Sequence, residues 1–440
     1  MKRWIAALVL AGAATAAAPE FFDGLADHPS LQAARANLQA YAYEAAYAGN
    51  PVALDTSGGY SYRSLDEAEP CPFLSDPDPT NDLLCQLVSP DVPSEVGQAE
   101  VGLTLRAFPY GDLADRVALA EINLRTAELD YQSARAKLER SALDAALKVR
   151  LAEKGLELAR EGEALAENAL EATRLRHAKG AASDRELRDA ERALEEARLQ
   201  RLSAEENLEL ARAQLAQFTS AAPPAWPWPS LEPPAEAEAP EVTKARLRIE
   251  QARVGEQRSL RSFWPVGEVR YQHNLDDYNA VGVSVESRTL GTRIYYNHQS
   301  YADLTRSRTQ DEWRVGLRLN ISADTWSGYE AARARLEGAQ AGLEAAQRQA
   351  ELERQALELR ITQSERAREL ARRAEADART NYEETARRVE LGLEPPLAAQ
   401  KAWVDAARAE LERMQAEHDA VRARLDLLVY LAVPPSEVWK

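Results

Sequence analysis

The side chains best suited to chemistry in this 440-residue chain are few and widely spaced. The sequence contains no HExxH, GxSxG or CxxC motif and no glycine-rich phosphate-binding loop. Its five histidines are His28, His177, His273, His298 and His418. Their separations do not match the spacings typical of metal ligands. We therefore expect no enzyme activity, no metal and no cofactor.

The two cysteines, Cys71 and Cys85, lie within residues 64–94, a segment rich in Pro, Asp and Ser. A disulfide between them would close a loop of about 15 residues and contribute about 3 kcal/mol in the chain-entropy model. Two unpaired surface thiols are the alternative. A disulfide requires an oxidising compartment, so the destination of the chain decides between the two.

The N-terminus indicates export. Lys2 and Arg3 precede an apolar run from Trp4 to Gly12, and Ala14 to Ala16 offers a cleavage site. This pattern predicts a signal peptide over residues 1–18. A retained anchor is less well supported, because the run is shorter than the roughly 20 residues of a spanning helix. Without the leader the chain has 52 Lys and Arg against 71 Asp and Glu, a net charge of −19, which argues against nucleic acid as a partner.

Heptad patterns predict two long helical hairpins. From about Asp112 to Leu175 the chain has no proline and repeats apolar residues every seven positions, which predicts a helix about 100 Å long at ~1.5 Å per residue. After Gly180, Ser183 and Glu186 have the spacing of a capping box that restarts a helix. The returning arm has a seam formed by Leu187, Leu194, Leu208 and Leu215 with Ala190, Ala197, Ala204 and Ala211. Arg201 interrupts its leucine row once.

The second half of the chain repeats the first. A second hairpin surrounds Gly392, and its returning seam is interrupted only by His418. Val101 to Leu105 recurs as Val315 to Leu319 at an offset of 214, and the two hairpin tips recur at 212. Such matching registers predict an internal tandem duplication. Gly155 and Gly162, one heptad apart, either permit close helix packing or are tolerated surface positions.

Aromatic residues gather where the helical pattern stops, and the sequence there alternates between apolar and polar. Val315, Leu317 and Leu319 alternate with polar or small residues in the way that lipid-facing strands do. A soluble β-sandwich would alternate similarly. If the strands lie in a membrane, they are too few to close a barrel within one chain, so several copies must share it. The second segment has four strand-like runs, Gly267 to Asn274, Ala280 to Glu286, Gly291 to Asn297 and Glu312 to Ile321.

The expected fold class is mainly α with a small β part. The expected division is residues 1–18 signal peptide, 19–50 short helix of repeat 1, 51–111 strands and cysteine loop, 112–218 first hairpin, 219–241 proline-rich connector, 242–263 short helix of repeat 2, 264–326 strands, 327–432 second hairpin and 433–440 C-terminal tail.

These features together resemble the TolC family of outer-membrane efflux channels. The most specific matches are Arg174 to Gly180 and Arg387 to Leu393, each a basic helix end, a glycine and then a new helix. The resemblance implies a homotrimer in which twelve helices form a periplasmic tunnel and pooled strands form one barrel in outer-membrane lipid. It also implies that the hairpin tips dock a periplasmic adaptor, which sits on an inner-membrane pump. The implied docking residues are Lys179, Gly180, Ala181, Leu391, Gly392 and Leu393.

The sequence departs from the family in two places. No aspartate follows the second tip, so a ring of aspartates at the aperture is in doubt. Other charged residues could line the aperture or be solvated surface charges: Asp184, Glu186, Glu390, Glu394 and Lys401. The family contributes two strands per repeat, so we interpret the inner two runs of the second segment as an extracellular hairpin extension.

The expected function is passive conduction through an outer-membrane duct that extends into the periplasm. A structural coiled-coil tether of the envelope is the main alternative, because it too would have heptads. A periplasmic adaptor subunit is the other, although adaptors carry one hairpin where this chain has two.

Overall fold

The computed structural model describes residues 19–62, 95–106, 110–229, 231–300, 309–319 and 321–439. The chain forms two compact units. The first comprises Met1–Ala40, Arg125–Leu247 and Gln340–Lys440, and the second comprises Tyr41–Leu124 and Arg248–Ala339. The leader, Cys71 and Cys85 lie outside the described residues, so the signal peptide and the disulfide stay predictions.

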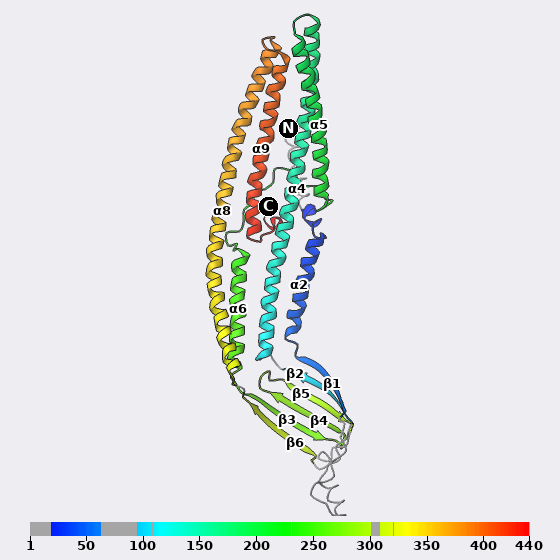
Figure 1. The fold of residues 1–440 in the computed structure, drawn as a ribbon, viewed down its shortest axis with the longest axis vertical. Coiled ribbons are helices and arrows are strands. Elements are labelled where there is room, and N and C mark those ends of the chain that lie inside the picture. Colours follow the sequence, from blue (N-terminus) through cyan, green and yellow to red (C-terminus); the bar gives the residue numbers. More distant parts are fainter. Residues whose placement is uncertain are drawn as a thin grey trace, which may run out of the picture. The chain divides into compact units, whose positions relative to one another are not determined.

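Two helical hairpins dominate the first unit, which confirms the predicted fold class (Figure 1). The first consists of α4 (Asp112–Ala178) and α5 (Asp184–Ala216), and the second of α8 (Ala323–Glu390) and α9 (Pro396–Tyr430). The buried residues of α5 are members of the predicted seam: Ala190, Leu194, Ala197, Leu208, Ala211 and Leu215. Arg201, which interrupts that seam, donates to Glu163 of α4 over 2.6 Å, so an ion pair joins the two helices there.

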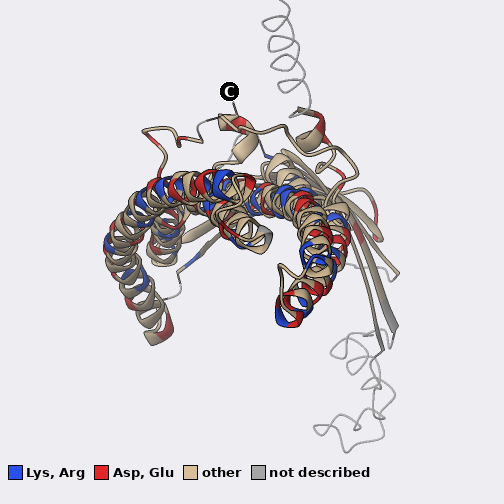
Figure 2. Ribbon diagram, turned by 90° about the horizontal axis from the view of Figure 1, so that it is seen from above, with Lys and Arg blue, Asp and Glu red and all other residues tan. Residues whose placement is uncertain are grey.

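The helices of the first unit pack in the order α8, α9, α4, α5. Arg360 of α8 pairs with Asp426 of α9 at 3.0 Å, and Asp426 also pairs with Arg140 of α4 at 2.9 Å. Arg212 of α5 pairs with Glu153 of α4 at 2.9 Å. Viewed from above, this row of helices follows an arc, with acidic and basic residues mixed along it (Figure 2).

The described residues include three further helices. These are α2 (Pro29–Ala48), α6 (Pro240–Arg261) and α10 (Pro435–Val438). The ring of His28 stacks on that of Phe218 with centroids 6.0 Å apart, so the start of α2 lies beside the end of α5. Helix α6 begins at Pro240, inside the predicted connector, because proline suits the first position of a helix.

The two helix glycines have different roles. A Cβ at Gly162 would lie 2.7 Å from a ring carbon of Trp403, so this glycine allows α4 and α9 to approach closely. A Cβ at Gly155 would have no described atom within 4 Å. Close packing is therefore confirmed at Gly162, whereas Gly155 is a tolerated position.

We predict opposite effects of alanine at these two glycines. Gly162→Ala should lower stability by about 1–3 kcal/mol, because the rigid Trp403 ring must move. Gly155→Ala should raise it by about 0.5–1 kcal/mol, because alanine favours the helix. Thermal unfolding of the detergent-solubilised variants measures both, and shifts of the same sign and size would contradict the assignment.

Six strands form one antiparallel sheet in the second unit (Figure 1). They are β1 (Val52–Tyr62), β2 (Glu95–Leu105), β3 (Val266–Asn274), β4 (Asn279–Glu286), β5 (Thr292–Gln299) and β6 (Asp311–Arg318). Their order is β1-β2-β5-β4-β3-β6.

The inner two runs of the second segment, β4 and β5, lie in the middle of this sheet, and β5 joins the two repeats by pairing with β2 from Gln98 to Leu105. Our interpretation of them as a hairpin extension outside the sheet is therefore wrong. The reason is that β4 and β5 have the same two-residue alternation as their neighbours, and alternation does not specify which strands pair.

Candidate functional site

The two hairpin tips have the same backbone geometry. Gly180 and Gly392 have φ of +74° and +70°, a conformation that favours glycine. At the first tip the N–H of Ala181 donates to the carbonyl of Arg176, and at the second the N–H of Leu393 donates to the carbonyl of Arg388. Both patterns are those of a Schellman motif that ends one helix and turns the chain. The tips are thus equivalent elements of a duplicated structure.

The side chains at the two tips differ. Leu391 and Leu393 flank Gly392 and are 74% and 72% exposed, so the second tip presents two apolar side chains to solvent. The first tip has Lys179 and Ala181 in the corresponding places. The second tip is therefore the more apolar of the two.

Most of the candidate aperture charges have partners within their own tip. Asp184 accepts from the Nε2 of His177 at 2.7 Å, and this hydrogen bond lowers the pKa of Asp184. Glu186 completes the predicted capping box, in which the Ser183 N–H donates to its carboxylate over 2.6 Å and lowers its pKa. Glu394 pairs with Arg388 at 3.3 Å.

The other two candidates, Glu390 and Lys401, are placed differently. Glu390 is an exposed residue at the last position of α8. Lys401 lines a cavity of about 570 Å³ between α5 and α9, together with Asp189, Arg192 and Asp405. The structure therefore does not gather the five charged candidates into one cluster.

The sheet in the second unit has one apolar face. Residues that lie opposite one another on neighbouring strands form rows across all six strands, and the side chains of alternate rows lie on this face. One row contains Val52, Leu105, Thr292, Val285, Val269 and Val315. The next contains Leu54, Leu103, Ile294, Val283, Tyr271 and Trp313. Most of these side chains are exposed, and Val315 and Leu317 are each 77% exposed. A continuous exposed apolar face of this extent marks an interaction with lipid or protein.

Polar and aromatic groups border this apolar face toward the β3–β4 turn. There the ring of His273 and the hydroxyl of Tyr271 both bond Asp311, at 2.8 and 2.7 Å. The hydroxyl of Tyr296 donates to Asn279 over 2.5 Å, and the rings of Tyr271 and Trp313 lie 4.8 Å apart. Aromatic side chains with a polar end favour the boundary between an apolar layer and water.

The opposite face of the sheet is polar. Arg293 pairs with Asp55 at 2.8 Å and with Glu100 at 2.7 Å, so it joins the first three strands of the sheet. The guanidinium of Arg270 lies 4.9 Å above the ring of Tyr295. That ring in turn covers Gly282, where an added Cβ would lie 2.3 Å from it. Charge networks on one face and exposed aliphatic rows on the other are typical of strands that lie between lipid and water.

His418, the polar residue in the α9 seam, lies in a buried cluster of the first unit. It is 1% exposed, and its Nε2 accepts from the Nη1 of Arg150 at 3.2 Å. The same guanidinium lies 4.0 Å above the ring of Trp226 in the connector. Burial, and then the charge of Arg150, lower the pKa of His418 to about 4. His418 is therefore neutral in the folded protein at pH 7.

We predict that His418 reduces stability as the pH falls from about 6.5 to about 4. In that window the unfolded chain binds a proton that the folded chain does not, so stability decreases with falling pH and is fully present above 6.5. The pKa difference corresponds to about 3 kcal/mol per chain. Unfolding midpoints between pH 4 and 8 should show a weaker pH dependence in His418→Gln than in the wild type. Equal dependence in His418→Gln and the wild type would contradict the assignment.

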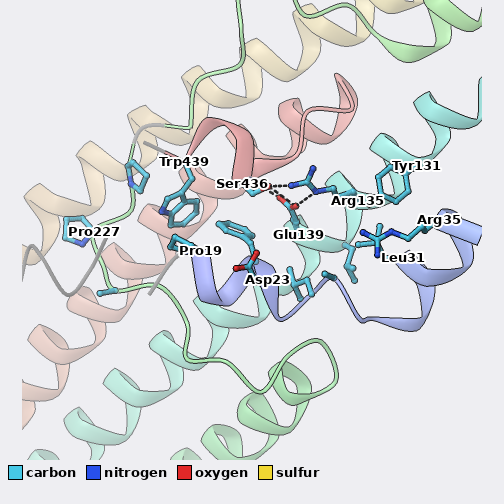
Figure 3. Close-up of a pocket in the computed structure, with 16 residues that line it drawn as sticks. Pro19, Asp23, Leu31, Arg35, Tyr131, Arg135, Glu139, Pro227, Ser436 and Trp439 are labelled. Carbon is cyan, nitrogen blue, oxygen red and sulfur yellow. Dashed lines mark hydrogen bonds and ion pairs between the residues drawn. The ribbon is translucent and has the colours of Figure 1, made fainter. Parts of the chain in front are cut away.

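A cavity of about 710 Å³ lies between the N-terminal segment, α4, the connector and the C-terminal tail (Figure 3). Glu139 of α4 is 3% exposed beside it and accepts from the backbone N–H of Ser436 at 2.8 Å and from the Nε of Arg135 at 2.9 Å. Burial raises the pKa of Glu139. Trp439 packs against Phe22 with ring centroids 5.3 Å apart. These contacts anchor the C-terminal tail to α4.

Sequence reasoning identified His418 as an interruption of a seam but missed its partners Arg150 and Trp226, and it missed the contact between Glu139 and Ser436. Ser436 is 297 residues from Glu139, so no local pattern links them. The sequence signal for the buried cluster was His418, a polar residue at a heptad position that is usually apolar.

No three His, Cys, Asp or Glu side chains among the described residues come together in a group that could hold a metal ion. None of the helices in these residues is both long enough and apolar enough to cross a bilayer.

The first repeat of the chain matches a known sequence family. The family model described as outer membrane efflux protein matches residues 23–221. No curated protein matches the chain.

The fold is similar to several solved structures. A membrane protein from Pseudomonas aeruginosa has a TM-score of 0.66 at 16% identity, over 96% of this chain and 91% of that one. The Campylobacter jejuni CmeC outer membrane channel has a TM-score of 0.63 at 13% identity, and the match covers 94% of this chain and 85% of that one. The open state of the Neisseria gonorrhoeae MtrE outer membrane channel has a TM-score of 0.61 at 16% identity, and the match covers 95% of this chain and 89% of that one. The match to the family model covers the first repeat, which is less than half of the chain, and the match to the solved structures covers both repeats.

Proposed function

We propose that this chain is the outer-membrane exit duct of an efflux or secretion system. Three copies assemble around one passage, which conducts substrates passively from the periplasm to the outside. The chain is an outer-membrane protein that extends into the periplasm. An inner-membrane pump supplies the energy, and a periplasmic adaptor connects that pump to the duct. No step is catalytic.

The observation that carries this proposal is the sheet with one apolar and one polar face. The strands of its first hairpin each have 11 residues, which is enough to cross a bilayer. In lipid every backbone polar group needs a partner, so an open six-stranded sheet is not stable there by itself. Several copies are therefore needed to close the sheet into a barrel. The polar face, with Arg293 and Glu100, would then line water.

The helices support the same assembly. Each chain places four long helices side by side along an arc (Figure 2). Three such arcs make a ring of twelve helices that can enclose a tunnel. The α5 seam of the first hairpin is buried within the chain, whereas Leu352, Leu359 and Leu370 of α8 are 58–66% exposed. These leucines are available for contact with the next copy.

The hairpin tips are proposed to dock the adaptor. Leu391 and Leu393 at the second tip provide the apolar contact, and Lys179 to Ala181 provide the equivalent turn at the first. The tips also border the proposed aperture. Asp184, Glu186 and Glu394 each bond a residue of their own tip. We therefore favour Glu390 and Lys401 as the charged residues of the aperture.

Two other functions are less well supported. A coiled-coil tether would explain the heptads but not the exposed aliphatic rows from Val52 to Val315. An adaptor would have one hairpin, whereas this chain has two equivalent tips at Gly180 and Gly392.

Electron microscopy of the detergent-extracted protein, combined with native mass spectrometry, tests the proposal. The duct requires membrane-bound protein that needs detergent for extraction and forms particles of threefold symmetry. Monomers or dimers extracted without detergent would instead indicate a tether.

A further inference from the structure

We propose that β1 of one copy pairs with β6 of the next, so that three copies form a barrel of eighteen strands. This inference rests on the proposed function, in which the copies share one barrel. It specifies which edges meet and how many strands the barrel has. With two strands per repeat, the same trimer would have only twelve.

The two outer strands provide the interaction surfaces. Within the described residues β1 pairs only with β2, and β6 pairs only with β3. Both strands carry exposed apolar side chains, Leu54 at 72% on β1 and Val315 at 77% on β6. An unpaired edge beside lipid leaves N–H and C=O groups without partners, which costs several kcal/mol for each group. The chain therefore needs a partner strand at each edge.

The strand directions favour a head-to-tail ring. Every neighbouring pair in the sheet is antiparallel, and the number of strands is even, so β1 and β6 run in opposite directions. When copies are related by rotation about the barrel axis, β1 of one meets β6 of the next as an antiparallel pair. The junction between copies thus has the same pairing as the interior of the sheet.

The free backbone groups at the two edges also match. Along an antiparallel pair of strands, every second residue bonds the partner strand and the residues between them point their backbone groups the other way. Because the N–H of Arg106 donates to the carbonyl of Pro51, Pro51 bonds β2. The N–H and C=O of Leu54 and Thr56 therefore point away from β2. On the other edge, the N–H of Asn274 donates to the carbonyl of Gln310. By the same alternation, the N–H and C=O of Val315 point away from β3. When these outward groups bond, directly opposite residues place their side chains on the same face. The apolar face therefore continues across the junction.

A twofold arrangement does not meet these requirements. Pairing β1 with a second β1 as antiparallel strands, with the apolar faces on one side, would invert one copy relative to the membrane. All copies are inserted in one orientation, so β6 is the available partner for β1. Pairing between β1 and β6 is heterologous and closes into a ring.

The position of the inserted hairpin explains the larger strand number. Strands β4 and β5 lie between β2 and β3, and their Val283 and Ile294 continue the apolar rows of the neighbouring strands. They therefore widen the barrel wall. Barrels of 16–18 strands leave an aqueous channel, so the outer exit of this duct should be wider than that of a twelve-stranded barrel.

Cysteine cross-linking tests which edges meet. In a Cys71→Ser, Cys85→Ser background, Leu54→Cys is combined separately with Trp313→Cys, Val315→Cys and Leu317→Cys, which samples three registers. The membrane-embedded protein is oxidised and run on a non-reducing gel. We expect at least one combination to give a covalent trimer, because directly paired strands bring Cα atoms within disulfide range.

Two matched controls accompany these variants. Leu54→Cys with Val283→Cys places the second thiol on the same apolar face but on an interior strand, and should give no intermolecular product. Leu54→Cys alone should give no covalent dimer; such a dimer would indicate that two β1 strands meet and would overturn the inference.

Failure of this inference can be distinguished from failure of the proposed function. If native mass spectrometry shows a trimer but none of the three edge combinations cross-links, the β1–β6 junction is wrong and the shared duct remains. If the protein is a monomer, both fail. A cryo-electron microscopy map of the trimer counts the strands directly, and twelve in place of eighteen would overturn the inference.

Discussion

Ile294→Lys is expected to destabilise the membrane-inserted protein by about 2–4 kcal/mol per copy, because a lysine near the middle of the apolar face would lie in hydrocarbon. Ile294 is on β5, between Leu103 and Val283 in one row of the sheet, and is 47% exposed. Three copies carry the change, so the effect on the trimer is threefold larger. The amount of trimer in the outer-membrane fraction and its thermal stability measure the loss.

Ser284→Lys is the matched control for this substitution. Ser284 lies on the neighbouring strand β4, opposite Arg293, and its side chain is on the polar face. A lysine there faces water in the proposed barrel and should insert normally. Equal tolerance of Ile294→Lys and Ser284→Lys would contradict the assignment of the two faces, because a sheet surrounded by water has no reason to reject only one of them.

Leu391→Asp combined with Leu393→Asp is expected to weaken adaptor binding by about 100-fold or more. A few residues at the centre of an interface contribute about 2 kcal/mol or more each, the aspartates add the cost of placing charge in an apolar contact, and a loss of about 2.8 kcal/mol corresponds to that factor. Both leucines are more than 70% exposed, so their replacement should leave folding and trimer formation unchanged. Affinity for the purified cognate adaptor, measured with the duct in detergent, gives the change.

Leu275→Asp provides the control for the tip variant. Leu275 is 55% exposed but follows β3, far along the sequence from either tip. It should not alter adaptor affinity. An unchanged affinity in the double tip variant would remove the second tip from the docking surface, while the first tip could still be tested through Lys179 and Ala181.

The long helices and the strands were predictable because their signals are local and periodic. The seam from Ala190 to Leu215 repeats every seven residues, and the buried side of α5 follows it. The capping box of Ser183 and Glu186 depends on residues three apart, and the structure contains it. The alternation from Val315 to Leu319 placed β6 within a few residues.

The strand order and the buried polar contacts were not predictable, because they depend on residues distant in the sequence. Any of the alternating runs could pair with any other, and only the structure shows that β5 joins β2. The partners of His418 come from α4 and the connector, 268 residues away for Arg150. The roles of the tip residues remain predictions, because docking depends on a partner protein.

Conduction through a planar lipid bilayer tests the central claim most directly. Purified protein is added to one side of the bilayer and the current is recorded under an applied voltage. The proposed duct predicts discrete current steps of uniform size as single trimers insert. Bilayers that take up the protein, as shown by its recovery with the lipid, yet never show such steps would contradict a conducting duct and favour a tether.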